Sequence, residues 1–191
     1  DERNIRFKSN LPWIVDTLRG IAEDPIAKDL AINQCKLQPI PIVIAAQSTE
    51  ACRRAARLNA GILFDSLQSP EVSKKLSSIY REAGGNGPVI LIRRVWIGSP
   101  PTSQIQAQME HYHSYASDRA KANWIQGDST VFGQNGAEAA ERLSGIVHDS
   151  GCDTVNIRVH VAGLKADQVI EQLGRHKDDL VPVLKSDLKR G

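Results

Sequence analysis

Three neighbouring polar residues, Gln47, Ser48 and Thr49, follow a short apolar run and precede a stretch rich in alanine and arginine. An amide, hydroxyls and the free N–H groups of a helix start are donors that hold a phosphate, and the positive end of the helix dipole adds to the attraction. These residues are therefore candidates for a phosphate or other anion site. The alternative stays open that Ser48 or Thr49 only caps the helix, since such caps are very common.

A second set of candidates lies in Asp153–Gly163 (DTVNIRVHVAG), where polar and apolar residues alternate. Asn156, Arg158 and His160 share one face of the expected strand. The opposite, apolar face consists of Val155, Ile157, Val159 and Val161. Because a packed barrel interior is mostly aliphatic, polar side chains on the face away from the helices indicate a ligand cavity. His160 is a weak candidate for a general acid or base, and a hydrogen-bonded core histidine is the alternative.

Arg93 and Arg94 are adjacent in an apolar run, so their side chains must leave opposite faces of a strand. One would enter the interior and meet a phosphate or a carboxylate such as Asp65, and a buried structural ion pair is the alternative. His111 and His113 have an i, i+2 spacing that suits no helical metal pair, and no metal site is predicted. The sequence also lacks GxGxxG, GxxxxGK[ST], HExxH and GxSxG, which disfavours classical dinucleotide folds, P-loop enzymes, zincins and serine hydrolases.

A repeated strand–helix pattern positions these residues. Each unit has a β-branched apolar run, a small or polar residue and an amphipathic helix, which predicts an α/β fold with a parallel sheet and right-handed crossovers. The predicted strands are Pro41–Ser48, Gly61–Leu67, Pro88–Gly98 and Asp153–Gly163. The predicted helices are Thr49–Asn59, Pro70–Gly84, Gly136–Gly151 and Lys165–Lys189. A full (β/α)8 barrel needs roughly 250 residues, so four units in 191 residues predict half of a TIM-type barrel.

Two segments fall outside these units. The apolar spacing in Leu11–Asp24 predicts an amphipathic helix with Pro12 in its first turn, and residues 25–40 are expected to be a connecting loop. Residues 99–133 form an insertion in which Gln104–Asn123 is the helical candidate, either as a flap over the site or as a surface excursion. We therefore expect an N-terminal helix and loop in 1–40 and a half-barrel domain in 41–191 that carries the insertion.

Composition excludes several classes. With 24 basic and 22 acidic residues, the chain has no basic stripe or interleaved aromatic residues for a nucleic acid. Three cysteines without CxxC spacing support neither a disulfide framework nor a thiolate zinc site, which fits a reducing, cytoplasmic setting. No segment reaches the roughly 18 to 20 apolar residues that span a bilayer, so no membrane partner is expected.

The order of these segments resembles the luciferase-like monooxygenase superfamily. The run PIVIAAQSTEACRRAARLNAGILFDSL is similar to that family's strand ending in serine, its alanine- and arginine-rich helix and its next strand opening with glycine. GPVILIRRVWIG and VFGQNGAEAAERLSGIVHDSGCDTVNIRVHVAG are similar to the family's last two strands and the helix between them. The resemblance covers residues 39–188 and corresponds to the C-terminal half of the family's barrel.

The resemblance implies a function and a cofactor. It implies a flavin-dependent oxidoreductase or monooxygenase that binds reduced flavin mononucleotide (FMN), or a deazaflavin coenzyme, and acts on a small molecule. In this family the residue matching Ser48, and less firmly Gln47 and Thr49, contacts the flavin phosphate, while Asp65 and Ser66 match positions beside the isoalloxazine ring. The family's first four strands have no counterpart, so we also expect a partner chain, a homo-oligomer or a missing N-terminal half. A non-catalytic flavin-binding or partner subunit is the alternative function.

Overall fold

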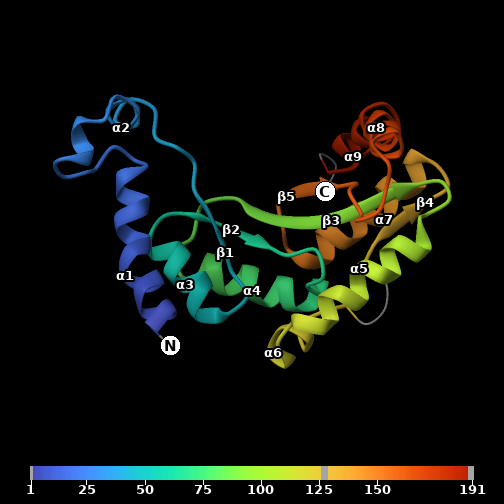
Figure 1. The fold of residues 1–191 in the computed structure, drawn as a ribbon, viewed down its shortest axis with the longest axis horizontal. Coiled ribbons are helices and arrows are strands. Elements are labelled where there is room, and N and C mark those ends of the chain that lie inside the picture. Colours follow the sequence, from blue (N-terminus) through green and yellow to red (C-terminus); the bar gives the residue numbers. More distant parts are fainter. Residues whose placement is uncertain (1, 126–128, 189–191) are drawn as a thin grey trace.

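A parallel β-sheet forms the centre of the chain, whose computed structural model describes residues 2–125 and 129–188. Within these ranges the strands are β1 (Val43–Ala45), β2 (Gly61–Phe64), β3 (Val89–Ile97), β4 (Val131–Gly133) and β5 (Thr154–Arg158). All neighbouring pairs are parallel, and β3 is the long central strand in Figure 1. Its Ile90–Arg94 segment pairs with β5 and its Val95–Ile97 segment pairs with β4. The predicted parallel α/β architecture is confirmed.

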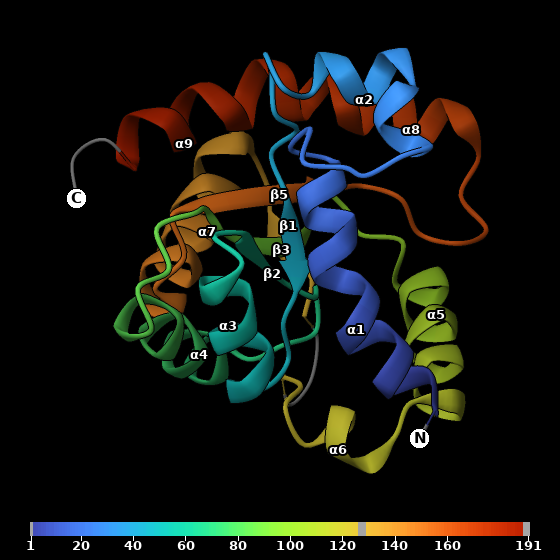
Figure 2. The same ribbon diagram turned by 90° about the vertical axis from the view of Figure 1, so that its left-hand side faces the viewer.

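Three helices cover one face of this sheet, as Figure 2 shows: α3 (Thr49–Arg57), α4 (Pro70–Glu82) and α7 (Gly136–Ser150). Each begins at a side-chain cap, because Ser48, Ser69 and Asn135 accept a hydrogen bond from the N–H three residues later. Pro70 occupies the first turn of α4, where its missing N–H has no helical partner to lose. These caps place the helix starts close to the positions that the sequence predicts.

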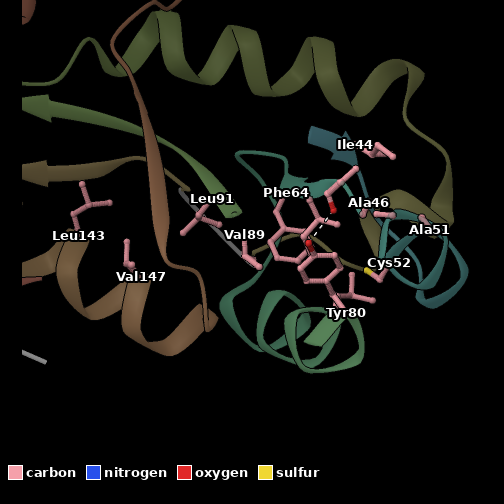
Figure 3. Packing of buried hydrophobic residues seen from close by; sticks show 14 of the residues in the cluster. Ile44, Ala46, Ala51, Cys52, Phe64, Tyr80, Val89, Leu91, Leu143 and Val147 are labelled. Atoms are coloured by element: carbon pink, nitrogen blue, oxygen red, sulfur yellow. Dashed lines mark hydrogen bonds between the residues drawn. The ribbon is translucent and has the colours of Figure 1, made fainter. Parts of the chain in front are cut away.

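The hydrophobic core lies between the sheet and these helices. Phe64, Tyr80, Val89 and Leu91 are each 0% exposed, and Figure 3 shows them packed with residues of β1, α3 and α7. The Tyr80 hydroxyl donates to the Ala60 carbonyl at 2.8 Å and accepts from the Gly87 N–H at 2.8 Å. This hydroxyl therefore joins α4 to the loops that precede β2 and β3.

The other face of the sheet is only partly covered. In β5, Val155 and Ile157 are half-buried while Asn156 and Arg158 are exposed, as the sequence alternation predicts. The apolar run Pro41–Ser48 is typical of a strand buried on both faces, but in β1 Val43 is 36% exposed. Only the helix-facing residue of β1 is buried, because no described element covers the opposite face of this strand.

The N-terminal segment differs from the prediction. Helix α1 spans Glu2–Thr17 rather than Leu11–Asp24, so Pro12 lies inside the helix and not in its first turn. Leu11 and Val15 of α1 belong to the hydrophobic core. Figure 2 shows α1 beside β1 and α3. The expected loop contains two short helices, a 3-10 turn at Ile26–Lys28 and α2 at Leu30–Gln34. The proposed division into residues 1–40 and 41–191 stays a prediction.

The insertion and the C-terminus complete the fold. Helices α5 (Thr102–Tyr115) and α6 (Asp118–Lys121) follow β3, and Figure 2 shows α5 across the sheet from α3, α4 and α7. The insertion also contains β4, which the sequence patterns do not predict. The C-terminal helix continues from α8 (Ala166–Arg175) through a π-helical turn (His176–Leu180) into α9 (Val181–Asp187). In the described ranges, none of the helices has the length and apolar character needed to cross a membrane.

Candidate active site

The candidate residues gather at one rim because parallel strands end at the same edge of a sheet. Gln47 and Asp65 each follow their strand by a residue or two, and Arg158 is the last residue of β5. The pairing of Ala45 with Leu63 places Gln47 and Asp65 level with each other two residues further on. Gln47 Nε2 donates a hydrogen bond to Asp65 Oδ2. The two strand ends are therefore joined directly.

Asp65 also organises the loop that follows β2. Its Oδ1 accepts hydrogen bonds from the N–H groups of Leu67 at 2.8 Å and Gln68 at 2.9 Å. With Gln47 on the other oxygen, the carboxylate links β1, β2 and the loop that carries Ser66. A buried or half-buried carboxylate is stabilised by such N–H donors. Asp65 thus has a structural role at the rim in addition to its predicted place beside a cofactor.

Arg93 supports the same loop from beneath. This side chain is fully buried on the helix-facing side of β3, and its guanidinium donates to backbone carbonyls of Asp65 (3.3 Å), Ser66 (3.3 Å), Gln68 (2.7 Å) and Ile92 (2.8 Å). Burial lowers the pKa of Arg93 to about 10, and the negative charge of Asp65 partly offsets this effect. Four carbonyl acceptors compensate the buried charge, so Arg93 holds the Asp65–Gln68 loop in place.

Arg94 leaves the opposite face of β3, as predicted for adjacent strand residues. It is 4% exposed, and its Nε donates to the His160 carbonyl at 3.3 Å. The ion-pair alternative finds no support, because none of the salt bridges between described residues involves Arg93 or Arg94. Both arginines bind backbone carbonyls instead.

A cavity of about 510 Å³ opens at the start of α3. Its polar lining includes Gln47, Ser48, Thr49, Lys75, Arg119 and Asn123. The Ser48 hydroxyl accepts from the Ala51 N–H at 3.3 Å, which leaves its own O–H able to donate into the cavity. The first N–H groups of a helix have no partner within it, so those of Thr49 and Glu50 are also donors. Hydroxyls, main-chain donors and two cationic side chains make this cavity suitable for an anion.

A second cavity of about 260 Å³ lies on the other side of Asp65. Asp65, Ser66 and Arg158 contribute its polar groups, and Leu67 and Ile92 contribute apolar ones. The insertion supplies Tyr112, Tyr115 and Trp124 as aromatic walls. Apolar and aromatic walls with a few polar groups are typical of sites for organic ligands. The structure thus brings Asp65, Ser66 and Arg158 together here, while Ser48 and Thr49 line the first cavity and Gln47 bridges to Asp65.

The insertion is attached to the loop after β2 by backbone bonds. Ser69 N–H donates to the Asn123 carbonyl at 3.0 Å, and Ile125 N–H donates to the Leu67 carbonyl at 2.8 Å. Gln68 and Trp124 lie opposite each other between these bonds as an antiparallel bridge. These contacts hold α5 and α6 beside the rim.

The histidines lie apart from the cavities. His111 packs edge-on against Tyr115, and His113 packs edge-on against Trp124, which shows both rings within the aromatic face of the insertion. His160 lies two residues beyond β5, and its side chain is exposed. It lines neither of the two rim cavities, so its catalytic role stays a prediction.

Sequence reasoning missed the contributions of the insertion and of α4. Arg119 of α6 and Lys75 of α4 are the cations of the first cavity, and neither stands in a recognisable motif. Tyr112 and Tyr115 fall in the helical candidate of the insertion, for which the sequence predicts no fixed position. Their spacing is the one signal that could have found them, since residues three apart lie on the same face of a helix.

Comparison with solved structures identifies the fold. No protein-family profile matches the chain, and no curated protein matches it significantly in sequence. The monooxygenase RslO1 from Streptomyces bottropensis superposes with a TM-score of 0.53 at 18% identity, over 76% of this chain and 49% of RslO1. Apo-MsnO8 superposes with a TM-score of 0.53 at 11% identity, over 95% of this chain and 60% of MsnO8.

These structures are TIM-barrel enzymes of the luciferase-like type. The chain has part of that fold. It spans about half of the length of RslO1 and about three fifths of that of MsnO8. At these identities the likeness concerns the fold alone, and the site residues are judged on their own geometry.

Proposed function

We propose that the chain forms the C-terminal half of a flavin-dependent oxidoreductase or monooxygenase of the luciferase-like type, acting on a small molecule in the cytoplasm. One observation carries this proposal. Two cavities of different chemistry adjoin at the carboxyl rim of a TIM-barrel-like sheet, and the Gln47–Asp65 hydrogen bond links their walls. FMN has the same division, with a phosphate at one end and a planar ring at the other.

The first cavity suits the phosphate end. Ser48, Thr49 and the first N–H groups of α3 would donate to phosphate oxygens, while Arg119 and Lys75 would balance the charge. Glu50 also borders this cavity, but its carboxylate pairs with Arg57 at 3.2 Å. The residues present therefore fit a phosphate, and Gln47 lies between the cavity for the phosphate and the cavity for the ring.

The second cavity suits the ring end. Ile92, Tyr112 and Trp124 offer apolar and aromatic surfaces, and Asp65, Ser66 and Arg158 offer polar groups for ring edges. A bound reduced flavin, or a deazaflavin, would supply the oxygen or hydride chemistry. The chain's own residues would bind and orient it, and the aromatic residues of the insertion would limit the access of water.

A non-catalytic flavin-binding or partner subunit is the second candidate function. The observation that favours it is that His160, the catalytic candidate from the sequence, lines neither of the two rim cavities. This alternative predicts flavin binding or stable association without turnover. A turnover assay with reduced flavin and oxygen separates it from the catalytic proposal.

A paired titration tests the cofactor. Flavin fluorescence is followed as the chain is added to FMN or to riboflavin, which lacks the phosphate. We expect saturable FMN binding that Arg119→Gln weakens about fivefold, the equivalent of roughly 1 kcal/mol for one exposed charged contact. Riboflavin binding should not change in this variant. Arg53→Gln, on the exposed side of α3, is the matched control. No saturable binding of either flavin at micromolar concentrations would refute the proposal.

A further inference from the structure

The sequence contains two asparagine–glycine pairs, Asn86–Gly87 and Asn135–Gly136. Such a pair can modify itself, because glycine has no Cβ to hinder the approach of its backbone nitrogen to the asparagine side chain. Attack of that nitrogen on the asparagine Cγ closes a cyclic imide and releases ammonia. One water molecule then opens the imide to aspartate, or to isoaspartate, in which the main chain runs through the side-chain carbon. Water is the sole co-reactant.

The side chain of Asn86 is available for this reaction. It is exposed in the loop between α4 and β3, outside any helix or strand. Among the residues that the structure describes, none forms a hydrogen bond with its amide group. Exposed loops of this kind open locally more readily than packed helices and strands.

The backbone nitrogen of Gly87 is restrained by one hydrogen bond. Its N–H donates to the buried Tyr80 hydroxyl at 2.8 Å. Arg81 Nη1 also donates to the Gly85 and Gly87 carbonyls, at 2.8 Å each, and holds the loop on both sides of Asn86. Attack requires the Gly87 nitrogen to lose its proton and turn toward the Asn86 Cγ. The bond to Tyr80 must therefore open first.

The second pair is built into the start of a helix. Asn135 Oδ1 accepts from the Glu138 N–H at 3.0 Å and so caps α7, a helix of 15 residues. Gly136 is buried, and a Cβ added to it would collide with the main chain of Asp179. Attack at this pair requires the cap and the first turn of a packed helix to open together.

We propose that Asn86 is a site of spontaneous deamidation whose rate is controlled by the Tyr80 hydroxyl, whereas the fold protects Asn135. Loop opening is fast compared with imide formation, so the rate of modification follows the population of the open form. Opening breaks one hydrogen bond at Gly87 but a cap and a helical turn at Asn135. The two pairs share the same chemistry and differ in the structure that must open.

Modification of Asn86 changes the contacts of Tyr80. The imide has no N–H at Gly87, so the hydroxyl loses its donor. Isoaspartate adds a carbon to the main chain before Gly87, where a Cβ on Gly87 would already lie 2.7 Å from the Gly61 nitrogen. The isoaspartate form should therefore have a Tm several degrees below that of the unmodified chain. Asn86→Asp keeps the ordinary main chain and is the matched control, which should melt like the wild type.

Peptide mapping by mass spectrometry during incubation at neutral pH tests the assignment. In guanidinium chloride the two pairs should convert at similar rates, because only their local sequence then acts. In the folded chain, protection relative to these denatured rates should be at least about tenfold greater at Asn135 than at Asn86. Equal protection of the two pairs, or faster conversion at Asn135, would overturn the proposal. This comparison needs no variant.

Tyr80→Phe tests the control of the rate. The variant should accelerate conversion at Asn86 about fivefold relative to Asn135, the equivalent of one lost hydrogen bond, and Tyr115→Phe should change neither rate. Equal acceleration at both asparagines would show general destabilisation only and would overturn the role of Tyr80. Neither asparagine lines a rim cavity, so these results are independent of flavin binding.

Discussion

Asp65 offers the sharpest test of the candidate site, because one carboxylate holds three segments together. Asp65→Ala removes acceptors for the Leu67 and Gln68 N–H groups and for the Gln47 amide. Hydrogen bonds to a charged group contribute roughly 1.5–3 kcal/mol each when buried. Asp65 is half-buried, so we take the low end for the two backbone bonds and expect a loss of about 3 kcal/mol in the free energy of unfolding.

Asp65→Asn separates the acceptor role from the charge. The asparagine oxygen still accepts from both backbone N–H groups, but its amide group meets the Gln47 amide donor and the negative charge near Arg93 is lost. We expect about 1 kcal/mol of destabilisation for this variant. For a chain of this size, 3 kcal/mol corresponds to a fall in Tm of about 6–12 °C.

Urea unfolding followed by circular dichroism measures both values. The slope of free energy against urea should be unchanged, since neither substitution alters the surface exposed on unfolding. Equal losses for the two variants, or a loss below about 1 kcal/mol for Asp65→Ala, would refute the view that backbone donors to this carboxylate fix the rim.

Three further outcomes are expected from single substitutions at Tyr80, His176 and Gly61, which line neither of the two rim cavities. Tyr80→Phe leaves the buried Ala60 carbonyl and the half-buried Gly87 N–H without their 2.8 Å partner. It should lower the free energy of unfolding by about 2–4 kcal/mol in urea titrations, whereas Tyr115→Phe at an exposed ring should change it little. Burial lowers the pKa of His176, so the imidazole of the unfolded chain takes up a proton before that of the folded chain as pH falls. The free energy of unfolding should therefore decrease below about pH 6.5, by at most about 1.4 kcal/mol per pH unit. His176→Gln should remove the contribution of this residue to the dependence of stability on pH. A retained slope in unfolding measured across this pH range would contradict the assignment to His176. Gly61→Ala would place a Cβ 2.7 Å from the Pro88 carbonyl oxygen. Because β2 and β3 would have to move apart, we expect the free energy of unfolding, measured by thermal unfolding, to fall by about 1–3 kcal/mol.

The sequence predicts the repeating part of the fold well because its signals are local. Capping residues and apolar periodicity place α3, α4 and α7 within a few residues of their observed limits. The alternation of polar and apolar residues is sufficient to identify the polar face of β5. Very short strands, and contacts between segments distant in sequence, cannot be predicted from such local patterns. Strand β4 has only three residues, and its pairing partner is the far half of β3.

The N-terminal helix shows a different failure. The apolar stripe suggests a start near Leu11, but α1 begins at Glu2 and continues through Pro12. Its first turns have few apolar contacts to produce a pattern. Proline within a helix removes one backbone hydrogen bond, and local rules therefore place it at a helix start. Packing of Leu11 and Val15 against the core favours the helix despite that loss.

Some residues of the candidate site can be predicted from the sequence and others cannot. Strand ends predict that Gln47, Asp65 and Arg158 share a rim, since this follows from parallel topology. The insertion supplies the cation Arg119 and the aromatic residues Tyr112 and Trp124. Its path over the rim depends on contacts with segments that are distant in sequence. No spacing rule relates them to the strand ends.

The backbone ties between the insertion and the β2 loop have a mechanical consequence. If the insertion moves away from the rim, either the hydrogen bonds donated by the Ser69 and Ile125 N–H groups break or the loop of Asp65 moves with it. Entry of a ligand beneath Tyr112 and a shift in the carboxylate that braces Gln47 would then be one movement. Binding of a ligand in the cavity lined by Tyr112 would therefore alter the anion cavity at the start of α3 through this direct connection.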